Sequence, residues 1–376
     1  MRILEITKTL DEWAPQQVAW ERDNPGIQVG YPGTELTNTL ICMDVSDSVI
    51  EEAIKRKCNL IISHHPLLFL PLKRITPETD RISRYISKLL KHNITLFSYH
   101  TNLDYTKHGV SFQLAKKLQL EGINFLEPLQ GGLSKFVVFS PESDVEKVSE
   151  AIFGAGGGVI GEYSNCSTRN EIKGTFKGSN NSNPTLGAKN VFETVKEIRL
   201  EAVVYDWLIP SVIERVKKVH SYEEPAFEVY KLQNSHTNFG AGAKGTLKNE
   251  MSTSGFLSFV SKSLNAECLR YGFNPPAKIK KVAVMGGAGQ DYLNKAISEG
   301  CNAFITGDIG YHRFQDSENK ILLIDAGHFE TEVSVLDEIR ERIISAKGFN
   351  KNDNMVFVAG SNAFNPVKYY NKRSGE

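Results

Sequence analysis

The chain has 376 residues, more than one compact domain usually holds, so we expect two domains or one domain with a large insertion. Its 44 basic and 44 acidic residues balance, which leaves no positive field to gather nucleic acid, so nucleic-acid binding is not favoured. No stretch reaches transmembrane length, and residues 1–13 read as a helix of the mature protein rather than as a signal peptide. Five scattered cysteines without a CxxC pair indicate buried thiols in a reducing compartment, so we expect a cytoplasmic protein without a membrane partner.

The first third of the chain alternates between strand and helix patterns. Apolar runs rich in β-branched residues predict strands over 39–45, 58–65 and 94–100, and helical periods predict helices over 48–57 and 82–92. This alternation is typical of a layered α/β domain in which helices cover a sheet.

The same order of strand and helix returns between residues 280 and 328. When the two halves are laid over each other, three pairs match: Cys58 with Cys301, His100 with His328, and Asp104 with Glu332. We therefore expect an α/β fold with two pseudo-symmetric halves. Chance similarity between two βαβ units remains the alternative.

Residues 131–233 follow a different pattern and are expected to form an independently folding insertion. Each end of this region reads as a strand, a helix and then a turn or strand, and a glycine-rich bend (154–161) and a Ser/Asn run (178–184) mark its loops. Because insertions succeed at surface loops whose ends lie close together, the flanking lobes 1–128 and 236–376 are expected to pack as one domain.

His64 and His65 stand at the end of a predicted strand, and Pro66 restrains His65 to an extended backbone. Adjacent side chains of an extended segment point to opposite sides, which suits two ligands that reach two different metals. Histidines that are merely hydrogen-bonded in a loop are the alternative interpretation.

Two further segments place imidazole and carboxylate groups just beyond strand ends. His100 and Asp104 follow one predicted strand, where ligands gather in open α/β sheets, although Asn102 or Asp104 would also serve as the cap of a helix that begins near His108. His328 and Glu332 lie four residues apart on one face of a helix, a spacing that suits one divalent ion. A solvated, salt-bridging helix face is the alternative there.

Taken together, these segments predict a metal site with the ligands His64, His65, Asp104, His328 and Glu332. Three imidazoles and two carboxylates exceed the four ligands of one structural zinc and suit two ions bridged by a carboxylate and a water. Nitrogen and oxygen ligands without thiolates fit two divalent ions of Zn, Mn, Fe, Co or Ni.

Other candidate groups are less clear from the sequence. The glycine-rich turn GGAGQD (286–291) reads as a tight turn or as a substrate contact, and Asp308 and His312 read as second-sphere or proton-transfer residues or as caps. The remaining histidines read as surface or packing residues: His92, His108, His220 and His236.

Six motifs, in this order, resemble the Nif3-like dinuclear-metal family, whose members are also called GTP cyclohydrolase 1 type 2 homologues: NPGIQVG, SHHPLLF, HTNLD, GGAGQD, TGDIGYH and GHFETE. The likeness covers residues 1 to about 128 and 236 to 370 and departs at Pro25, where a small aliphatic residue is more common. It implies a two-lobed Nif3-like fold, a homohexameric toroid of two stacked trimers, and the five metal ligands already named. His100 is not a direct ligand in this family, so we expect it to act as a nearby acid or base.

The insertion 131–233 resembles the PII-like or CutA-like domains of longer family members, which implies a ferredoxin-like α+β module that tends to trimerise. The resemblance to the Nif3-like family implies a dinuclear metal-dependent hydrolase of a small molecule. Hydrolytic opening of a purine nucleotide such as GTP is one reaction, with His100 as its proton-transfer residue. Other phosphoester or nucleotide hydrolysis is an alternative. So are a metal-binding regulatory hexamer whose insertion senses a small molecule and a scaffold for protein partners.

Overall fold

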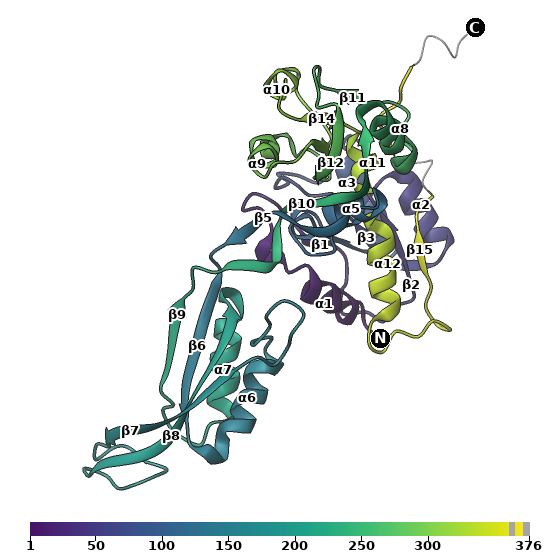
Figure 1. Cartoon of the computed structure of the whole chain (residues 1–376). Coiled ribbons are helices and arrows are strands. Elements are labelled where there is room, and N and C mark those ends of the chain that lie inside the picture. The colour runs from purple at the N-terminus through teal and green to yellow at the C-terminus, as the bar shows by residue number, and fades with distance from the viewer. Residues whose placement is uncertain (361–364, 371–376) are drawn as a thin grey trace. The chain divides into compact units, whose positions relative to one another are not determined.

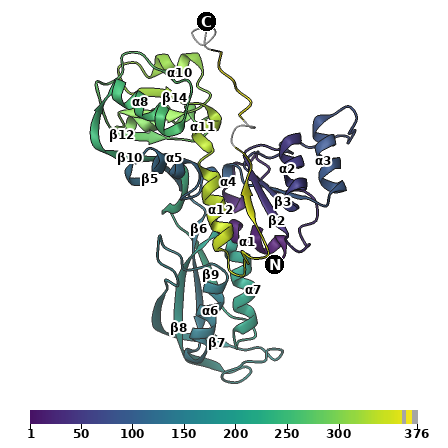
Figure 2. The ribbon, with the colours of Figure 1, turned by 90° about the vertical axis from the view of Figure 1, so that its right-hand side faces the viewer.

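The structure is a computed structural model, and it describes residues 1–360 and 365–370. Part of the expected second lobe, 236–376, therefore lies outside the described residues. The chain forms two compact units, drawn in Figure 1 and Figure 2. Unit 1 contains Met1–Glu127 and the described residues from Phe239 onward, and unit 2 contains Pro128–Asn238.

A five-stranded sheet in unit 1 is built mainly by the first part of the chain. Its strands, in spatial order, are β1 (Gly26–Val29), β4 (Thr95–Ser98), β3 (Cys58–Ser63), β2 (Asn38–Cys42) and β15 (Val356–Val358). All neighbours are parallel except β1, which runs antiparallel to β4. The strand β15 comes from the far end of the chain, so the second half of the sequence completes the sheet that the first half builds.

Helices cover both faces of this sheet. One face packs against α1 (Ile3–Trp13) and α12 (Val335–Ser345), and the other against α2 (Asp47–Lys55) and α3 (Arg81–Lys91). Within β3, Leu60 joins the first of these cores and Ile61 joins the second. Since a parallel sheet is buried on both faces, the near-continuous apolar runs of these strands are explained.

The second sheet of unit 1 has six strands. In spatial order they are β11 (Arg270–Tyr271), β14 (Leu322–Asp325), β13 (Ala303–Thr306), β12 (Lys278–Val284), β10 (Ser235–Ser252) and β5 (Glu121–Gln130). The strands β12, β13 and β14 are parallel, and β11 runs antiparallel to β14. The succession β11-β14-β13-β12 thus has the same directions and order as β1-β4-β3-β2 in the first sheet.

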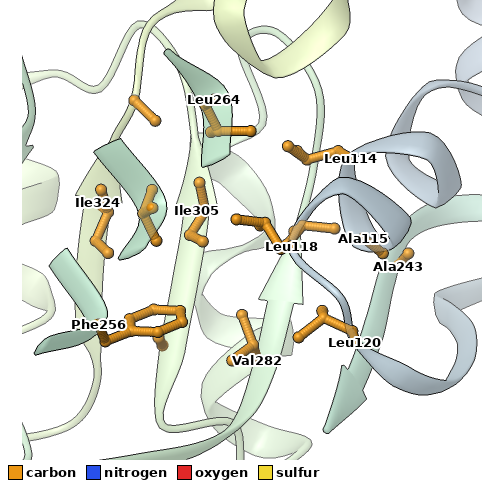
Figure 3. Close-up of a cluster of buried hydrophobic side chains, with 14 of the residues drawn as sticks. Leu114, Ala115, Leu118, Leu120, Ala243, Phe256, Leu264, Val282, Ile305 and Ile324 are labelled. Atoms are coloured by element: carbon orange, nitrogen blue, oxygen red, sulfur yellow. The ribbon is translucent and has the colours of Figure 1, made fainter. Parts of the chain in front are cut away.

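One face of the six-stranded sheet packs against α5 (Val110–Lys117) and α8 (Thr253–Leu264). Figure 3 shows Leu114 and Leu118 near the strand residues Val282 and Ile305. The opposite face packs against α9 (Leu293–Ser298) and α10 (Tyr311–Asp316). Two four- to five-residue helices complete unit 1 beside the strand ends: α4 (Thr101–Asp104) and α11 (His328–Glu332). The expected long helix after residue 327 is therefore divided, because α11 ends at Glu332 and α12 begins at Val335.

Unit 2 has its own sheet and core. Its elements, in chain order, are β6 (Leu133–Ser140), α6 (Val145–Gly154), β7 (Thr168–Lys177), β8 (Phe192–Tyr205), α7 (Ile209–Val219) and β9 (Phe227–Lys231). The four strands lie in the order β7-β8-β6-β9, and every pair is antiparallel. Both helices pack on one face of the sheet, against side chains such as Phe136 and Leu200.

The predicted α/β architecture is confirmed, and the strands and helices expected over 39–100 and 280–328 are present. Among the described residues, no helix combines the length and the apolar character needed to cross a membrane. All five cysteines are free thiols. The expectation that they are buried is wrong for Cys268, which is exposed because it lies in the loop after α8.

Candidate metal centre

The ends of the parallel strands hold the histidines of unit 1 in fixed positions. The backbone ladder continues beyond β3, where the N–H of His64 donates to the carbonyl of Cys42 (3.0 Å) and the N–H of His65 donates to that of Met43 (2.9 Å). These two hydrogen bonds hold the bend that directly follows β3. The side chains do not separate to opposite sides as predicted, because the bend brings the two ring centroids within 4.9 Å of each other.

Glu332 lies between two groups of side chains. Its Oε1 lies 3.7 Å from Nε2 of His64, and the same His64 nitrogen lies 3.7 Å from Oδ1 of Asp104. Its Oε2 lies 3.2 Å from Nε2 of His65 and 3.2 Å from Nε2 of His328. The five predicted ligands thus form two sets of donor atoms that share one carboxylate. The ligand atoms of His64, His65 and Glu332 lie within 4.8 Å of one another and could hold a metal ion.

Each of the three histidines has its second ring nitrogen held by an acceptor. Nδ1 of His64 donates to the carbonyl of Tyr99 (2.8 Å), Nδ1 of His65 to Asp44 (2.9 Å) and Nδ1 of His328 to Asp308 (2.7 Å). Because these acceptors carry no hydrogen to donate, every Nδ1 keeps its proton in the neutral ring and every Nε2 keeps a lone pair. Acceptors of this kind orient metal-binding histidines and increase their basicity.

Two buried donor atoms of the site have no hydrogen-bond partner among the described residues. They are Nε2 of His64 and Oδ1 of Asp104. The His64 side chain is 0% exposed and that of Asp104 19% exposed, so bulk solvent has little access to them. Leaving buried polar atoms unpaired costs about 1–3 kcal/mol each. A positive ion among them would remove that cost, so the residues present fit a metal.

Burial and the neighbouring carboxylates shift the pKa values of the candidate ligands. Burial would lower the pKa of His65, but the carboxylates of Asp44 and Glu332 outweigh it and raise the pKa to about 10. The Glu332 carboxylate raises the pKa of His328 to about 9 against the effect of burial. Burial raises the pKa of Asp104. The Glu332 carboxylate therefore stabilises a positive charge on the neighbouring imidazoles, as it would stabilise a metal ion.

Glycines give the Glu332 carboxylate its space. A Cβ at Gly287 would lie 2.3 Å from Glu332 Oε1, and the residue has a φ of +60°, so only glycine is accommodated without strain. The N–H of Gly287 donates to Oγ1 of Thr331 (3.0 Å), which ties the turn to α11. Of the two interpretations of the GGAGQD turn, these contacts favour a tight turn that packs against the candidate ligands.

His100 lies beside the candidate ligands without belonging to either set. Its ring centroid is 5.4 Å from that of His64 and 5.6 Å from that of His65. Its Nδ1 donates to Oδ1 of Asp23 (2.8 Å), whose side chain is fully buried, and Asp23 also accepts from the backbone N–H of Thr101 (3.0 Å). Burial alone would raise the pKa of Asp23, but the hydrogen bonds from His100 and Thr101 outweigh it and lower the pKa.

A cavity of about 510 Å³ opens beside His65 and His328. Arg270 forms part of its wall, where its guanidinium pairs with Asp325 and donates to the carbonyl of Ile309 (3.0 Å). The Arg270 side chain is still 58% exposed, so it remains available to a molecule in the cavity. This volume is sufficient for a small organic substrate.

The geometry bears on the alternatives that the sequence left open. Neither Asn102 nor Asp104 caps the helix that follows, because α5 has Gly109 at its N-cap and no side-chain cap. The His328–Glu332 face is solvated only at His328, since the His328 side chain is 36% exposed and that of Glu332 4% exposed. Asp308 contacts His328, as a second-sphere residue would, whereas His312 is exposed on α10, and among the described residues its ring contact is with Tyr311. The five ligands lie together, but their binding of metal remains a prediction.

Sequence reasoning missed two carboxylates. Asp44 follows the end of β2 at the same sheet edge as His65, and this position was a usable signal. Asp23 lies in the loop before β1 and reaches His100 from 77 residues away in the chain, so no local pattern marked it. The histidines of unit 2, His220 and His236, contact backbone carbonyls there and are packing residues, as expected.

Comparison with known proteins places this fold and site in a family. The Duf34/NIF3 (NGG1p interacting factor 3) family matches residues 1–362. A protein of Halalkalibacterium halodurans named "GTP cyclohydrolase 1 type 2 homolog" is 36% identical over 325 residues, which cover 86% of this chain and 87% of the relative. A protein of the same name from Bacillus subtilis is 36% identical over 331 residues, which cover 88% of each chain.

Solved structures agree with the sequence relatives. The crystal structure of a Bacillus cereus protein related to NIF3 superposes with a TM-score of 0.83 at 32% identity and covers 98% of this chain and 99% of that one. A Staphylococcus aureus protein superposes with a TM-score of 0.75 at 26% identity over 98% of this chain and 99% of that one. These matches extend over nearly the whole length of each protein. The chain therefore belongs to the Duf34/NIF3 family.

Proposed function

We propose that the chain is a dinuclear metal-dependent hydrolase of a small molecule. The observation that supports this best is the pair of donor sets that share Glu332, with buried atoms that lack a hydrogen-bond partner on His64 and Asp104. A structural core would not leave such atoms unpaired, because each costs free energy that an apolar side chain would not.

In this proposal His64, Asp104 and Glu332 would hold one ion, and His65, His328 and Glu332 would hold the second. The ligand set lacks thiolates and admits Zn, Mn, Fe, Co or Ni. Two such ions would supply Lewis acidity, which activates water at neutral pH and stabilises negative charge in the transition state. The carboxylates of Asp44 and Asp308 hold His65 and His328 in the orientation that directs Nε2 at the ions.

His100 is the proton-transfer residue in this proposal. Asp23 holds the proton on Nδ1, so Nε2 of His100 is the atom that accepts a proton from the attacking water and returns it to the leaving group. Thr101 donates two hydrogen bonds to Asp23, from its N–H and its hydroxyl, and so fixes the carboxylate that orients the imidazole.

The substrate class follows from the cavity and from the relatives. Arg270 offers a planar positive group that suits a phosphate or carboxylate. The relatives from Halalkalibacterium halodurans and Bacillus subtilis are named for a GTP cyclohydrolase. We therefore propose a nucleotide substrate, with hydrolysis at C8 of the GTP imidazole ring and release of formate as the first reaction to examine. Hydrolysis of a phosphoester in another nucleotide is the second.

The test is formate and phosphate release from GTP by protein reconstituted with each of the five metals in turn. The proposal predicts release of one product with at least one metal and its loss in Glu332→Gln. Glu341→Gln is the matched control, because Glu341 lies on α12, is 65% exposed and does not line the cavity. Product release without any metal, or undiminished in Glu332→Gln, would count against the proposal.

A second candidate is a metal-binding regulatory or scaffold assembly. It is favoured by unit 2, which is compact by itself and whose β-α-β-β-α-β order supports a ferredoxin-like, PII/CutA-like module. In either case we propose a homohexamer of two stacked trimers. An enzyme with His328→Ala keeps the hexamer in analytical ultracentrifugation and loses turnover, whereas an assembly held by structural metals loses the hexamer.

A further inference from the structure

Unit 2 contains a cavity of about 770 Å³ that has no part in the metal centre. It lies between β7, the loop that follows β7, and the segment after α7. Its volume is within the range of about 300–1,000 Å³ that is usual for small-molecule sites. Aromatic side chains line it, from Phe139 at the end of β6, Phe176 on β7 and Tyr222.

Hydrogen bonds hold the loop over the cavity. The N–H of Asn183 donates to Oε2 of Glu223 (2.8 Å), and the hydroxyl of Thr185 donates to the carbonyl of Ser221 (2.7 Å). Gly178 allows the chain to fold back, because a Cβ there would lie 2.6 Å from Oγ of Ser182. The loop is thus fastened to the opposite wall, and the cavity is preformed.

The opposite wall is fixed as firmly. Nε2 of His220 donates to the carbonyl of Phe139 (3.0 Å), and the N–H of Tyr222 donates to Nδ1 of the same imidazole (3.0 Å). The N–H of Ser221 donates to Oδ2 of Asp144 (2.8 Å). Since a preformed wall does not have to be ordered on binding, a ligand that enters here loses little affinity to reorganisation.

The strand register places Glu197 on one face of the sheet and the cross-strand lysine pair of β7 and β8 on the other. Ile172 pairs with Glu197 across β7 and β8, so both side chains lie on one face. Lys173 pairs with Lys196, and these side chains lie on the other face. Lys173 therefore lines the cavity through its backbone, and the strand face toward the cavity carries the Glu197 carboxylate without a lysine opposite it.

Glu197 occupies a space that a glycine provides. A Cβ at Gly174 would lie 2.0 Å from Oε2 of Glu197, so the carboxylate rests directly on the backbone of β7. The basic side chains on the same face, Lys135 and Arg199, pair with Glu201 instead of Glu197. The hydroxyl of Tyr222 lies beside the Glu197 carboxylate. A carboxylate held among Ile172, Phe176 and Tyr222 without a cation is suited to receive one.

We propose that this cavity binds a small organic cation, with an ammonium or guanidinium group at Glu197 and an apolar body against the aromatic side chains. Glu223 and Glu224 also line the cavity and add negative potential. Lys177 lines it too, but it alternates with Phe176 along β7 and therefore lies on the same face as Lys173. The site is independent of the metal centre and of the proposed hydrolysis.

The test is isothermal titration calorimetry of the full chain with matched probes. Phenethylamine, tyramine, agmatine and spermidine supply the cation, and 3-phenylpropionate has an apolar body like that of phenethylamine with the opposite charge. We expect at least one amine to bind about tenfold or more tightly than 3-phenylpropionate, and its affinity to fall about tenfold or more in Glu197→Gln, since the variant removes the charge that pairs with the ammonium group. Lys196→Gln is the control that keeps the affinity, because Lys196 lies on the other face of the sheet and does not line the cavity.

Two further measurements distinguish a loss of binding from a folding defect in the variant. The melting temperature of Glu197→Gln is compared with that of the parent chain, and a crystal of the parent chain is soaked with the tightest amine. The proposal requires the cationic nitrogen within about 3 Å of the Glu197 carboxylate. It is overturned if none of the four amines binds, if 3-phenylpropionate binds equally well, if folded Glu197→Gln binds as before, or if the soaked amine lies elsewhere.

Discussion

The imidazoles of His65 and His328 face each other with their Nε2 atoms 3.3 Å apart, although each ring already directs Nδ1 at a carboxylate. Two neutral rings held in this way would point two lone pairs at each other, which is unfavourable. A proton or a metal ion between them removes the repulsion. The Glu332 oxygen 3.2 Å from both nitrogens adds the negative charge that such a cation needs.

The two donor sets predict that single substitutions remove ions separately. In Asp104→Asn the ion beside His64 is weakened, and in His328→Asn the ion beside His65 is weakened, so each variant should retain about one of two ions per subunit. Elemental analysis of reconstituted, desalted protein measures this. Equal loss of both ions in both variants would instead indicate one shared ion.

Gly287→Ala should disturb the site through Glu332. The new Cβ would lie 2.3 Å from Glu332 Oε1, so the carboxylate must move and metal affinity should fall about tenfold or more. Gly300→Ala is the matched control, because Gly300 also has a positive φ (+70°) but no atom within 4 Å of its Cβ position. Both variants should lose about 1–2 kcal/mol from backbone strain, and only the first should lose metal. Metal titration followed by thermal melting distinguishes them.

Asp23→Asn should slow hydrolysis without removing metal. The amide no longer fixes the proton on Nδ1 of His100, and the loss of acid–base catalysis should lower kcat by about 10²-fold. If Asp23 acts only through His100, adding Asp23→Asn to His100→Gln should cause no further loss. A second large decrease in the double variant, or altered metal content in Asp23→Asn, would assign Asp23 to another role.

The ionised carboxylate of Asp144 should stabilise the fold of unit 2, and this stabilisation should be lost at low pH. Burial alone would raise its pKa, but hydrogen bonds from Ser221 and Lys147 lower the pKa to about 2 from an ordinary value of 3.8. A carboxyl group whose folded-state pKa is depressed stabilises the fold above its ordinary pKa, and this contribution is lost as the pH falls from about 4 toward 2. Since the Lys147 partner is 46% exposed, solvent screening limits the contribution to about 1–2 kcal/mol.

Thermal melting of the parent chain and of Asp144→Asn between pH 6 and pH 2 measures this contribution. The parent chain should be the more stable at pH 6, and the difference should shrink as the pH approaches 2. A difference that stays constant across this range would show that the ionised carboxylate contributes nothing through its charge.

Much of the fold could be predicted because the pattern of each element is local. The run 58–65 and its flanking helix predict β3 and α2, and the repeat of this pattern over 280–328 predicts β12 to β14. The pairing of β15 with β2 could not be predicted, since it joins residues more than 300 positions apart and its three residues carry no periodicity. The break between α11 and α12 was missed because the apolar spacing continues through it.

In the candidate site, too, residues in a local pattern could be predicted, and contacts between residues far apart in the chain could not. His64, His65, His328 and Glu332 stand at strand ends or at helical spacing, so the sequence marks them. Asp23 reaches His100 only because the loop before β1 crosses the end of β4, and no periodic pattern reports such a crossing. The internal repeat pairs His100 with His328 and would by itself make His100 a ligand. In the structure, however, Nδ1 of His100 is bound to Asp23 and the residue belongs to neither donor set.

The most direct test of the central claim is the anomalous scattering from a crystal of the reconstituted protein, recorded at the absorption edge of the bound metal. The account predicts two peaks about 3.5–4 Å apart, one beside His64 and Asp104 and the other beside His65 and His328, with Glu332 between them. A single peak, or none after reconstitution with each of Zn, Mn, Fe, Co and Ni, would contradict it.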